Sequence, residues 1–117
     1  MDANAGYTEL LPYIDYKEGL QRVMNSKNLY HRLLKSFKDG SLVSALLTAL
    51  QANDLKEMER AAHTVKGTAA NLGLKELFEL SLALETEIKG GAKPQSTSAF
   101  EEAAEKTAAA IDRLLEE

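Results

Sequence analysis

The chain has 117 residues and a formal net charge of −4, a size that corresponds to one domain with a modest buried core. It contains no cysteine, which excludes disulfides and thiolate metal sites, and no apolar run reaches the roughly 18 residues of a membrane span. The negative charge argues against nucleic acid as the main partner, because binding to phosphates needs clustered Lys and Arg.

The N-terminal part of the chain is predicted to hold short helical segments. Residues 1–13 form a lead-in without the basic and apolar runs of a signal peptide. Together with the missing cysteines, this favours a cytoplasmic protein that does not contact membranes. A first helix is predicted over residues 15–24. A second starts from a cap at Asn25 or Ser26 and ends before Gly40.

Two further helices are predicted in the middle of the chain. Ser41 can cap the first of them, which repeats Leu and Ala at helical spacing. Asp54 follows a turn, and Glu57 stands three residues later, which is the spacing of a capping box. The next helix is therefore predicted over residues 55–72, with Gly73 as a left-handed C-terminal cap.

The last third of the chain predicts two more helices separated by a loop. The first covers residues 75–89, the loop spans 90–98, and the last helix opens at the end of this loop. No segment alternates with period two, and the short links favour antiparallel neighbours. The sequence therefore predicts an all-α fold, an antiparallel four-helix bundle with short extra helical segments at its N-terminus. We expect a monomeric, single domain over residues 1–117, with the bundle starting near residue 15.

The predicted helix over residues 55–72 has a clear apolar stripe and one histidine outside it. On a helical wheel at about 100° per residue, His63 points roughly 100–140° away from most of the stripe, so we expect it at the rim or in solvent. Lys66 and Gly67 lie one turn beyond His63, and Ala70 lies two turns beyond. The stripe consists of Leu55, Met58, Ala62, Val65, Ala69 and Leu72.

An exposed imidazole framed in this way suits phosphoryl chemistry. Imidazole with an ordinary pKa near 6.5 is largely neutral at pH 7, so one ring nitrogen has a lone pair that can attack phosphorus. The product carries about two negative charges, which the ammonium of Lys66 can stabilise. Glycine inside a helix costs roughly 0.5–1 kcal/mol relative to alanine, and room for a phosphoryl group or a partner is a sufficient reason for Gly67. The alternatives are a solvated His63 and a Gly67 that allows another helix to pack closely.

These residues resemble a known family. His63-Thr-Val-Lys66-Gly67, the small residues that follow, Leu72-Gly73 and the downstream pair Leu84-Glu85 are similar to the motif of the histidine-containing phosphotransfer (HPt) domain. The resemblance covers roughly residues 14–89. Val65 stands where the family more usually has Leu, a small change on the core side of the helix.

The resemblance implies a four-helix bundle that shuttles phosphoryl groups between receiver domains and has no kinase site or cofactor of its own. It assigns the phosphoryl group to His63, an assisting role to Lys66 and Gly67, and a place beside the histidine to Glu85. A basic residue one turn further corresponds to Lys89. An ordinary surface pair between Glu85 and Lys89 is the alternative. The helical wheel adds three candidates for docking the receiver: Ala70, Leu74 and Phe78.

Other constellations are weaker. The second histidine, His31, has no Lys-Gly pair after it and is expected to be a surface residue. A metal site from His63, Glu59 and Glu85 is conceivable by ligand type, but it lacks a metal-binding spacing, so no metal is expected. Two other functions stay open: a helical adaptor that binds receivers without carrying phosphate, and the phosphoacceptor domain of a chemotaxis-type kinase.

Overall fold

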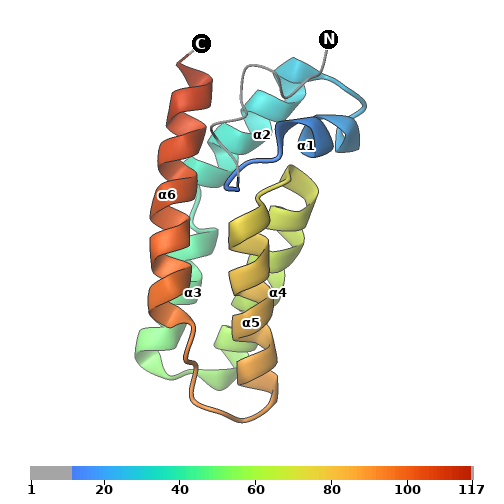
Figure 1. The fold of residues 1–117 in the computed structure, drawn as a ribbon. Helices are drawn as coiled ribbons and strands as arrows, with labels where there is room; N and C mark the ends of the chain where they lie inside the picture. Colours follow the sequence, from blue (N-terminus) through green and yellow to red (C-terminus); the bar gives the residue numbers. More distant parts are fainter. Residues whose placement is uncertain (1–11, 117) are drawn as a thin grey trace.

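The computed structural model describes residues 12–116, and this part of the chain folds into helices without strands (Figure 1). Most of the predicted lead-in over residues 1–13, including the segment without signal-peptide features, lies outside the described residues. The helices are α1 (Tyr16–Arg22), α2 (Lys27–Asp39), α3 (Leu42–Ala52), α4 (Leu55–Leu72), α5 (Lys75–Lys89) and α6 (Thr97–Leu115). None of them is both long and apolar enough to traverse a lipid bilayer.

Helices α3, α4, α5 and α6 form an antiparallel four-helix bundle, with α1 and α2 packed at one end (Figure 1). α4 packs against α5 on one side and against α3 on the other, and α6 closes the bundle against α5 and α3. The predicted fold class is therefore confirmed. The predicted bounds of α4 and α5 are confirmed as well.

Local signals explain where α4 begins and ends. The side chain of Asp54 accepts a hydrogen bond from the backbone N–H of Glu57 at 3.3 Å. Gly73 adopts a left-handed φ of 72°, which ends the helix without side-chain strain. The second half of the expected capping box does not form: the backbone N–H of Asp54 donates to Ala49, and the carboxylate of Glu57 pairs with Arg60.

Serine caps behave differently along the chain. Ser26 caps α2 by accepting from the backbone N–H of Leu29. Ser41 occupies the N-cap position of α3, as predicted, but its side chain makes no cap hydrogen bond. The N-cap residue of α6, Ser96, makes no side-chain cap hydrogen bond either. The carboxylate of Glu87 instead accepts hydrogen bonds from the backbone N–H groups of Gln95 and Ser96, directly before the helix.

The apolar stripe of α4 faces the core of the bundle. Its predicted members are buried with one exception, and Ala61 is buried beside them. Leu55, the first residue of α4, is 64% exposed, so its assignment to the core was wrong. Leu55 begins α4. The helical wheel gives the direction of its side chain but does not show whether another helix covers that end. The confirmed members are Met58, Ala62, Val65, Ala69 and Leu72.

The N-terminal helices are attached to the C-terminal end of α4. The hydroxyl of Tyr30 in α2 donates to the carbonyl oxygen of Leu72 at 2.6 Å, and burial raises the pKa of this hydroxyl. Gly19 of α1 packs into the same junction, where an added Cβ would lie 2.7 Å from the Leu72 oxygen. The backbone N–H of Asp15 donates to the carbonyl of Gly73 at 2.8 Å. This junction fixes the end of α4 about two and a half turns beyond His63.

Candidate functional site

His63 and Glu85 meet across the contact between α4 and α5. His63 lies in the middle of α4, and its side chain is 68% exposed. Glu85 comes from α5, and its side chain is only 6% exposed. The Nδ1 atom of His63 lies 2.7 Å from Oε2 of Glu85. The imidazole is thus open to solvent on one side and held by a buried carboxylate on the other.

Two lysines surround the same carboxylate. Lys66 donates from Nζ to Oε1 of Glu85 at 2.6 Å, and the Nζ of Lys89 lies 3.9 Å from Oε2. The hydrogen bond from Lys66, helped by that from His63, holds the pKa of Glu85 below its usual range, although burial acts in the opposite direction. Glu85 is therefore ionised near neutral pH and can only accept hydrogen bonds.

This carboxylate sets the tautomer of His63. An ionised carboxylate accepts hydrogen bonds only, so the proton of the neutral imidazole resides on Nδ1 and the lone pair on Nε2. The two ring nitrogens point in roughly opposite directions. Because Nδ1 faces Glu85 on α5, Nε2 faces away from α5 on the exposed side of the ring. The arrangement presents a nucleophilic nitrogen to solvent.

The charges around His63 favour an anion despite the carboxylate. A lone Glu85 would repel a phosphoryl group, but both of its oxygens have partners. The ammonium groups of Lys66 and Lys89 together carry one more unit of charge than Glu85. The structure brings together four of the residues that the sequence singled out: His63, Lys66, Glu85 and Lys89.

Gly67 borders the open side of His63. It is exposed, and no atom lies within 4 Å of the position that a Cβ would occupy. Close packing of another helix therefore does not explain this glycine. The surface beside His63 is unobstructed at this position.

The docking candidates divide into two kinds. Ala70 and Phe78 are half-buried and border a shallow hollow of about 130 Å³. Leu74 lines the same hollow but is fully buried, so it offers no exposed surface to a partner. The wheel of α4 does not extend to it, because the left-handed turn at Gly73 changes the direction of the chain first.

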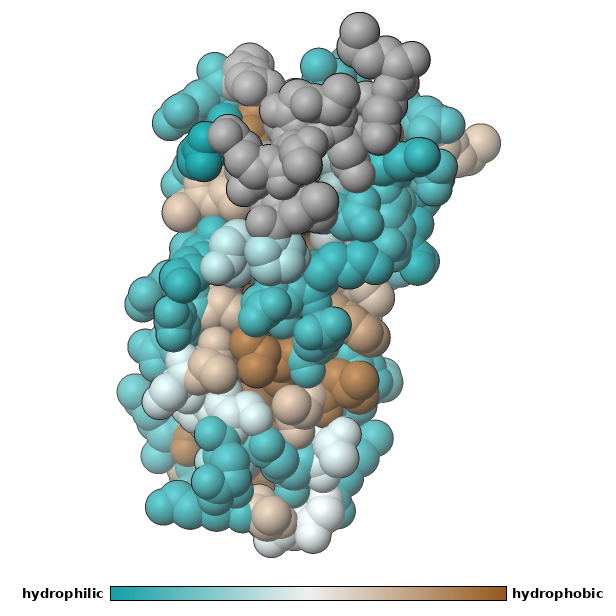
Figure 2. Space-filling model, viewed as in Figure 1, coloured by the Kyte–Doolittle hydropathy of each residue, from teal (hydrophilic) through white to brown (hydrophobic). Residues whose placement is uncertain are grey.

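Leu82, one turn before Glu85 on α5, is an apolar residue that the sequence had given no role. Its side chain is 41% exposed. Figure 2 shows apolar surface gathered over the middle of α5 on the viewed face. The sequence does show that Leu82 precedes Glu85 by three residues on the same helix. Residues with this spacing are neighbours on the helix surface.

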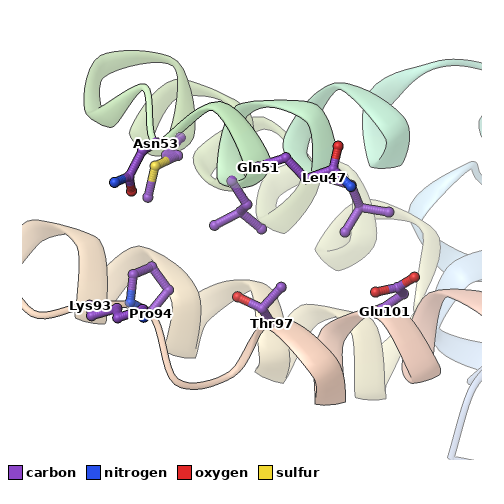
Figure 3. A pocket seen from close by; sticks show the side chains of 9 residues that line it. Leu47, Gln51, Asn53, Lys93, Pro94, Thr97 and Glu101 are labelled. Carbon is purple, nitrogen blue, oxygen red and sulfur yellow. The ribbon is translucent and has the colours of Figure 1, made fainter.

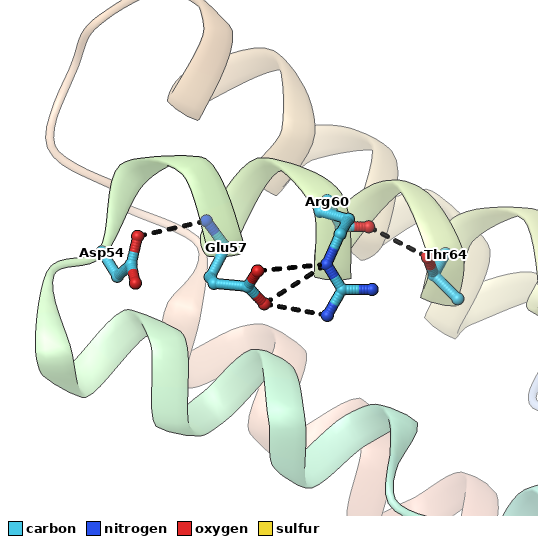
Figure 4. A network of polar contacts seen from close by, with 4 residues as sticks. All are labelled: Asp54, Glu57, Arg60 and Thr64. Carbon is cyan, nitrogen blue, oxygen red and sulfur yellow. Dashed lines mark hydrogen bonds and ion pairs between the residues drawn. The ribbon is translucent and has the colours of Figure 1, made fainter.

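A chain of polar contacts runs along the exposed face of α4 toward His63 (Figure 4). Arg60 donates to Glu57 through Nη2 at 2.8 Å and through Nε at 3.2 Å, and this guanidinium lowers the pKa of the Glu57 carboxyl. The hydroxyl of Thr64 donates to the backbone carbonyl of Arg60 at 3.0 Å. Apart from Asp54 and Glu57 as capping residues, the sequence had given these positions no role.

The remaining candidates are not assembled into sites. His31 is half-buried, and its Nε2 atom lies 2.9 Å from the hydroxyl of Tyr16 in α1, so it has a polar partner away from His63. Over residues 12–116, no three His, Asp or Glu side chains are grouped to hold a metal ion, and Glu85 is already paired with Lys66.

A separate hollow of about 250 Å³ lies between α3 and the start of α6 (Figure 3). Its polar lining includes Gln51, Asn53, Lys93 and Thr97. It contains no histidine and lies apart from the contact between α4 and α5.

Comparison with known proteins identifies a family. A family model described as Hpt domain matches residues 33–117, which include α4, α5 and α6 and every residue of the His63 site. No curated protein and no solved structure gives a significant match to the chain.

Proposed function

Because the chain belongs to the Hpt domain family, we propose that it receives a phosphoryl group on His63 from the aspartate of one receiver domain and passes it to another. Hpt domains are phosphocarrier modules of two-component signalling rather than kinases, and they interact with receiver domains. The assignment of residues, the use of two receivers and a single domain over residues 1–117 are parts of the proposal. The observation that carries it is the hydrogen bond between His63 and the buried Glu85.

The transfer step uses the free nitrogen of the ring. The lone pair of Nε2 attacks the phosphorus of the aspartyl phosphate in line. The bond between phosphorus and the aspartate oxygen breaks, and the carboxylate leaves with the electron pair. The ring keeps its proton on Nδ1 and becomes positively charged, and Glu85 stabilises this charge. The reverse sequence delivers the group to a second receiver.

The other residues of the site position and stabilise. Lys66 fixes the carboxylate of Glu85 and offsets its charge. Lys89 is more exposed and can turn toward the partner or the phosphoryl group. Gly67 leaves space for the receiver to approach. Most of the rate then comes from positioning, as is usual for phosphoryl transfer. We expect the magnesium ion and the acidic pocket of the transfer to belong to the receiver, so the chain needs no cofactor.

Transfer of label from a phosphorylated receiver tests this function. The chain should acquire label that is acid-labile and alkali-stable, as phosphohistidine is. His63→Gln should abolish labelling, and His31→Gln should preserve it because His31 contacts Tyr16 instead of the site. Label that survives His63→Gln and disappears in His31→Gln would refute the assignment.

The two alternatives give different results in the same assay. An adaptor would bind receivers and take up no label across a panel of them. The phosphoacceptor domain of a chemotaxis-type kinase would be labelled by a kinase catalytic domain with ATP and not by phosphorylated receivers.

A further inference from the structure

Arg60 is the nearest cation of α4 on the N-terminal side of His63. It precedes His63 by three residues, so the two side chains are neighbours on the helix surface. Its guanidinium is held by Glu57 through the two contacts described above (Figure 4). The side chains of Arg60 and Glu57 are 64% and 48% exposed, and ion pairs with this exposure are weak. The ion pair with Glu57 therefore holds Arg60 only weakly, and Arg60 can exchange Glu57 for another anion.

The orientation of His63 places the two sides of the ring in different surroundings. Nδ1 faces Glu85, where Lys66 and Lys89 are gathered. Nε2 points the other way. Residues three before and three after His63 lie on opposite flanks of it, each about 60° around the helix. Lys66 lies on the flank toward α5, so Arg60 lies on the flank toward which Nε2 points.

We propose that Arg60 is a phosphoryl-binding residue of this site, which exchanges Glu57 for the phosphoryl group when His63 is phosphorylated. This inference rests on the proposed function. A phosphoryl group carries about −1.5 to −2 charges and offers several acceptor oxygens, so it competes well with one exposed carboxylate. The planar guanidinium can donate two hydrogen bonds to it at once. Glu57 then acts as a resting partner that competes with the phosphoryl group.

The test uses the whole chain phosphorylated by phosphoramidate, without any receiver. Nε2 attacks phosphorus, the phosphorus–nitrogen bond of the donor breaks, and ammonia leaves. The pKa of the phosphoryl group on His63 is then followed by phosphorus NMR. Arg60→Gln should raise this pKa by about half a pH unit, or about threefold in proton affinity, because a cation that favours the dianion is lost.

Glu57→Gln should shift the same pKa downward, because Arg60 is released from its competitor. This effect should largely disappear when Arg60→Gln is also present, since it depends on the guanidinium. Lys106→Gln is the matched control. It removes one charge from an exposed ion pair on α6, where Lys106 Nζ lies 2.8 Å from Glu102, and should leave the pKa unchanged.

A second measurement follows the side chain itself. The Nε resonances of Arg60 should move when the wild-type chain is phosphorylated and stay in place in His63→Gln treated alike. If His63 takes label but Arg60→Gln matches Lys106→Gln and the Arg60 resonances do not move, this inference is wrong and the proposed function stands. If phosphoramidate leaves His63 unlabelled, both are overturned.

Discussion

The Nδ1 atom of His63 in α4 lies 2.7 Å from Oε2 of Glu85 in α5, and the carboxylate is almost completely buried. Glu85 lies 22 residues after His63 in the chain. Because α4 and α5 are antiparallel neighbours, the two residues come to the same level of the bundle. α4 thus carries the imidazole of His63, and Glu85 of α5 orients the ring.

Glu85→Gln should slow phosphoryl transfer to His63 by about tenfold. A hydrogen bond to a charged group contributes about 1.5–3 kcal/mol, and the lower end applies because the imidazole is mostly exposed. The glutamine amide can also rotate and donate to Nδ1, which would move the proton of the ring to Nε2 and block the attack. Rapid-quench measurement of label transfer from a phosphorylated receiver checks this. An unchanged transfer rate with folding intact would show that Glu85 does not orient the ring.

The lowered pKa of Glu85 predicts that the stability of the fold depends on pH. The pKa of Glu85 is lowered in the folded chain, chiefly by the hydrogen bond from Lys66. Its stabilising contribution is therefore complete above the unfolded pKa, near 4.3, and is lost as the pH falls through the lower folded value. The free energy of unfolding, measured with urea between pH 7 and pH 3, should fall less steeply below pH 5 in Glu85→Gln than in the wild type. Parallel curves would contradict the lowered pKa.

Two substitutions of Gly67 should have separate effects, one on stability and one on phosphoryl transfer. No atom lies within 4 Å of its potential Cβ, so Gly67→Ala should stabilise the chain by about 0.5–1 kcal/mol through better helix propensity. Gly67→Arg should leave helicity intact and slow transfer, because the long side chain covers the open surface beside His63. Urea unfolding and circular dichroism measure the first effect, and label transfer measures the second. Unfolding of Gly67→Arg would identify Gly67 as a packing residue instead.

Tyr30→Phe should lower the free energy of unfolding by about 1–2 kcal/mol, because the buried carbonyl of Leu72 loses its hydrogen bond from the hydroxyl. Gly19→Ala should cost more, since the added methyl group meets the same carbonyl at 2.7 Å. Urea unfolding gives both values. Gly67→Ala is the matched control, because both glycines lie inside helices but only Gly67 has free space for a methyl group. Gly91→Ala is unsuitable, because φ is 77° there. Equal stability of Gly19→Ala and Gly67→Ala would contradict the tight junction.

Signals that act within one turn of chain made the helices predictable. Asp54 and Gly73 mark the ends of α4, and the period of its apolar residues gives the face that is buried. The position of His63 outside this face could be predicted for the same reason. The contact between Glu85 and both His63 and Lys66 could not be derived from spacing, because it depends on how α5 is rotated against α4. Only the family resemblance placed Glu85 near His63.

The helical wheel stops being valid at the two ends of α4. Leu55 lies at the first residue of α4, and Leu74 lies beyond its left-handed end. Glu57 has the spacing of a capping box, but Arg60 one turn later is a cation and competes for the carboxylate. In each case the outcome depends on residues that neither the helical wheel nor the capping-box spacing includes.

Leu74 and Leu82 provide the last comparison, between a residue of the core and one of the surface. Leu74→Ala should lower the free energy of unfolding by about 2–5 kcal/mol, because the fully buried side chain leaves a cavity. Leu82 is 41% exposed beside Glu85, so Leu82→Ala should change stability by less than about 1 kcal/mol. If the receiver covers this part of α5, Leu82→Ala should weaken its binding severalfold in calorimetric titration. Leu29→Ala, which removes an exposed leucine of α2, is the matched control, and equal affinities of the two variants would place the receiver elsewhere.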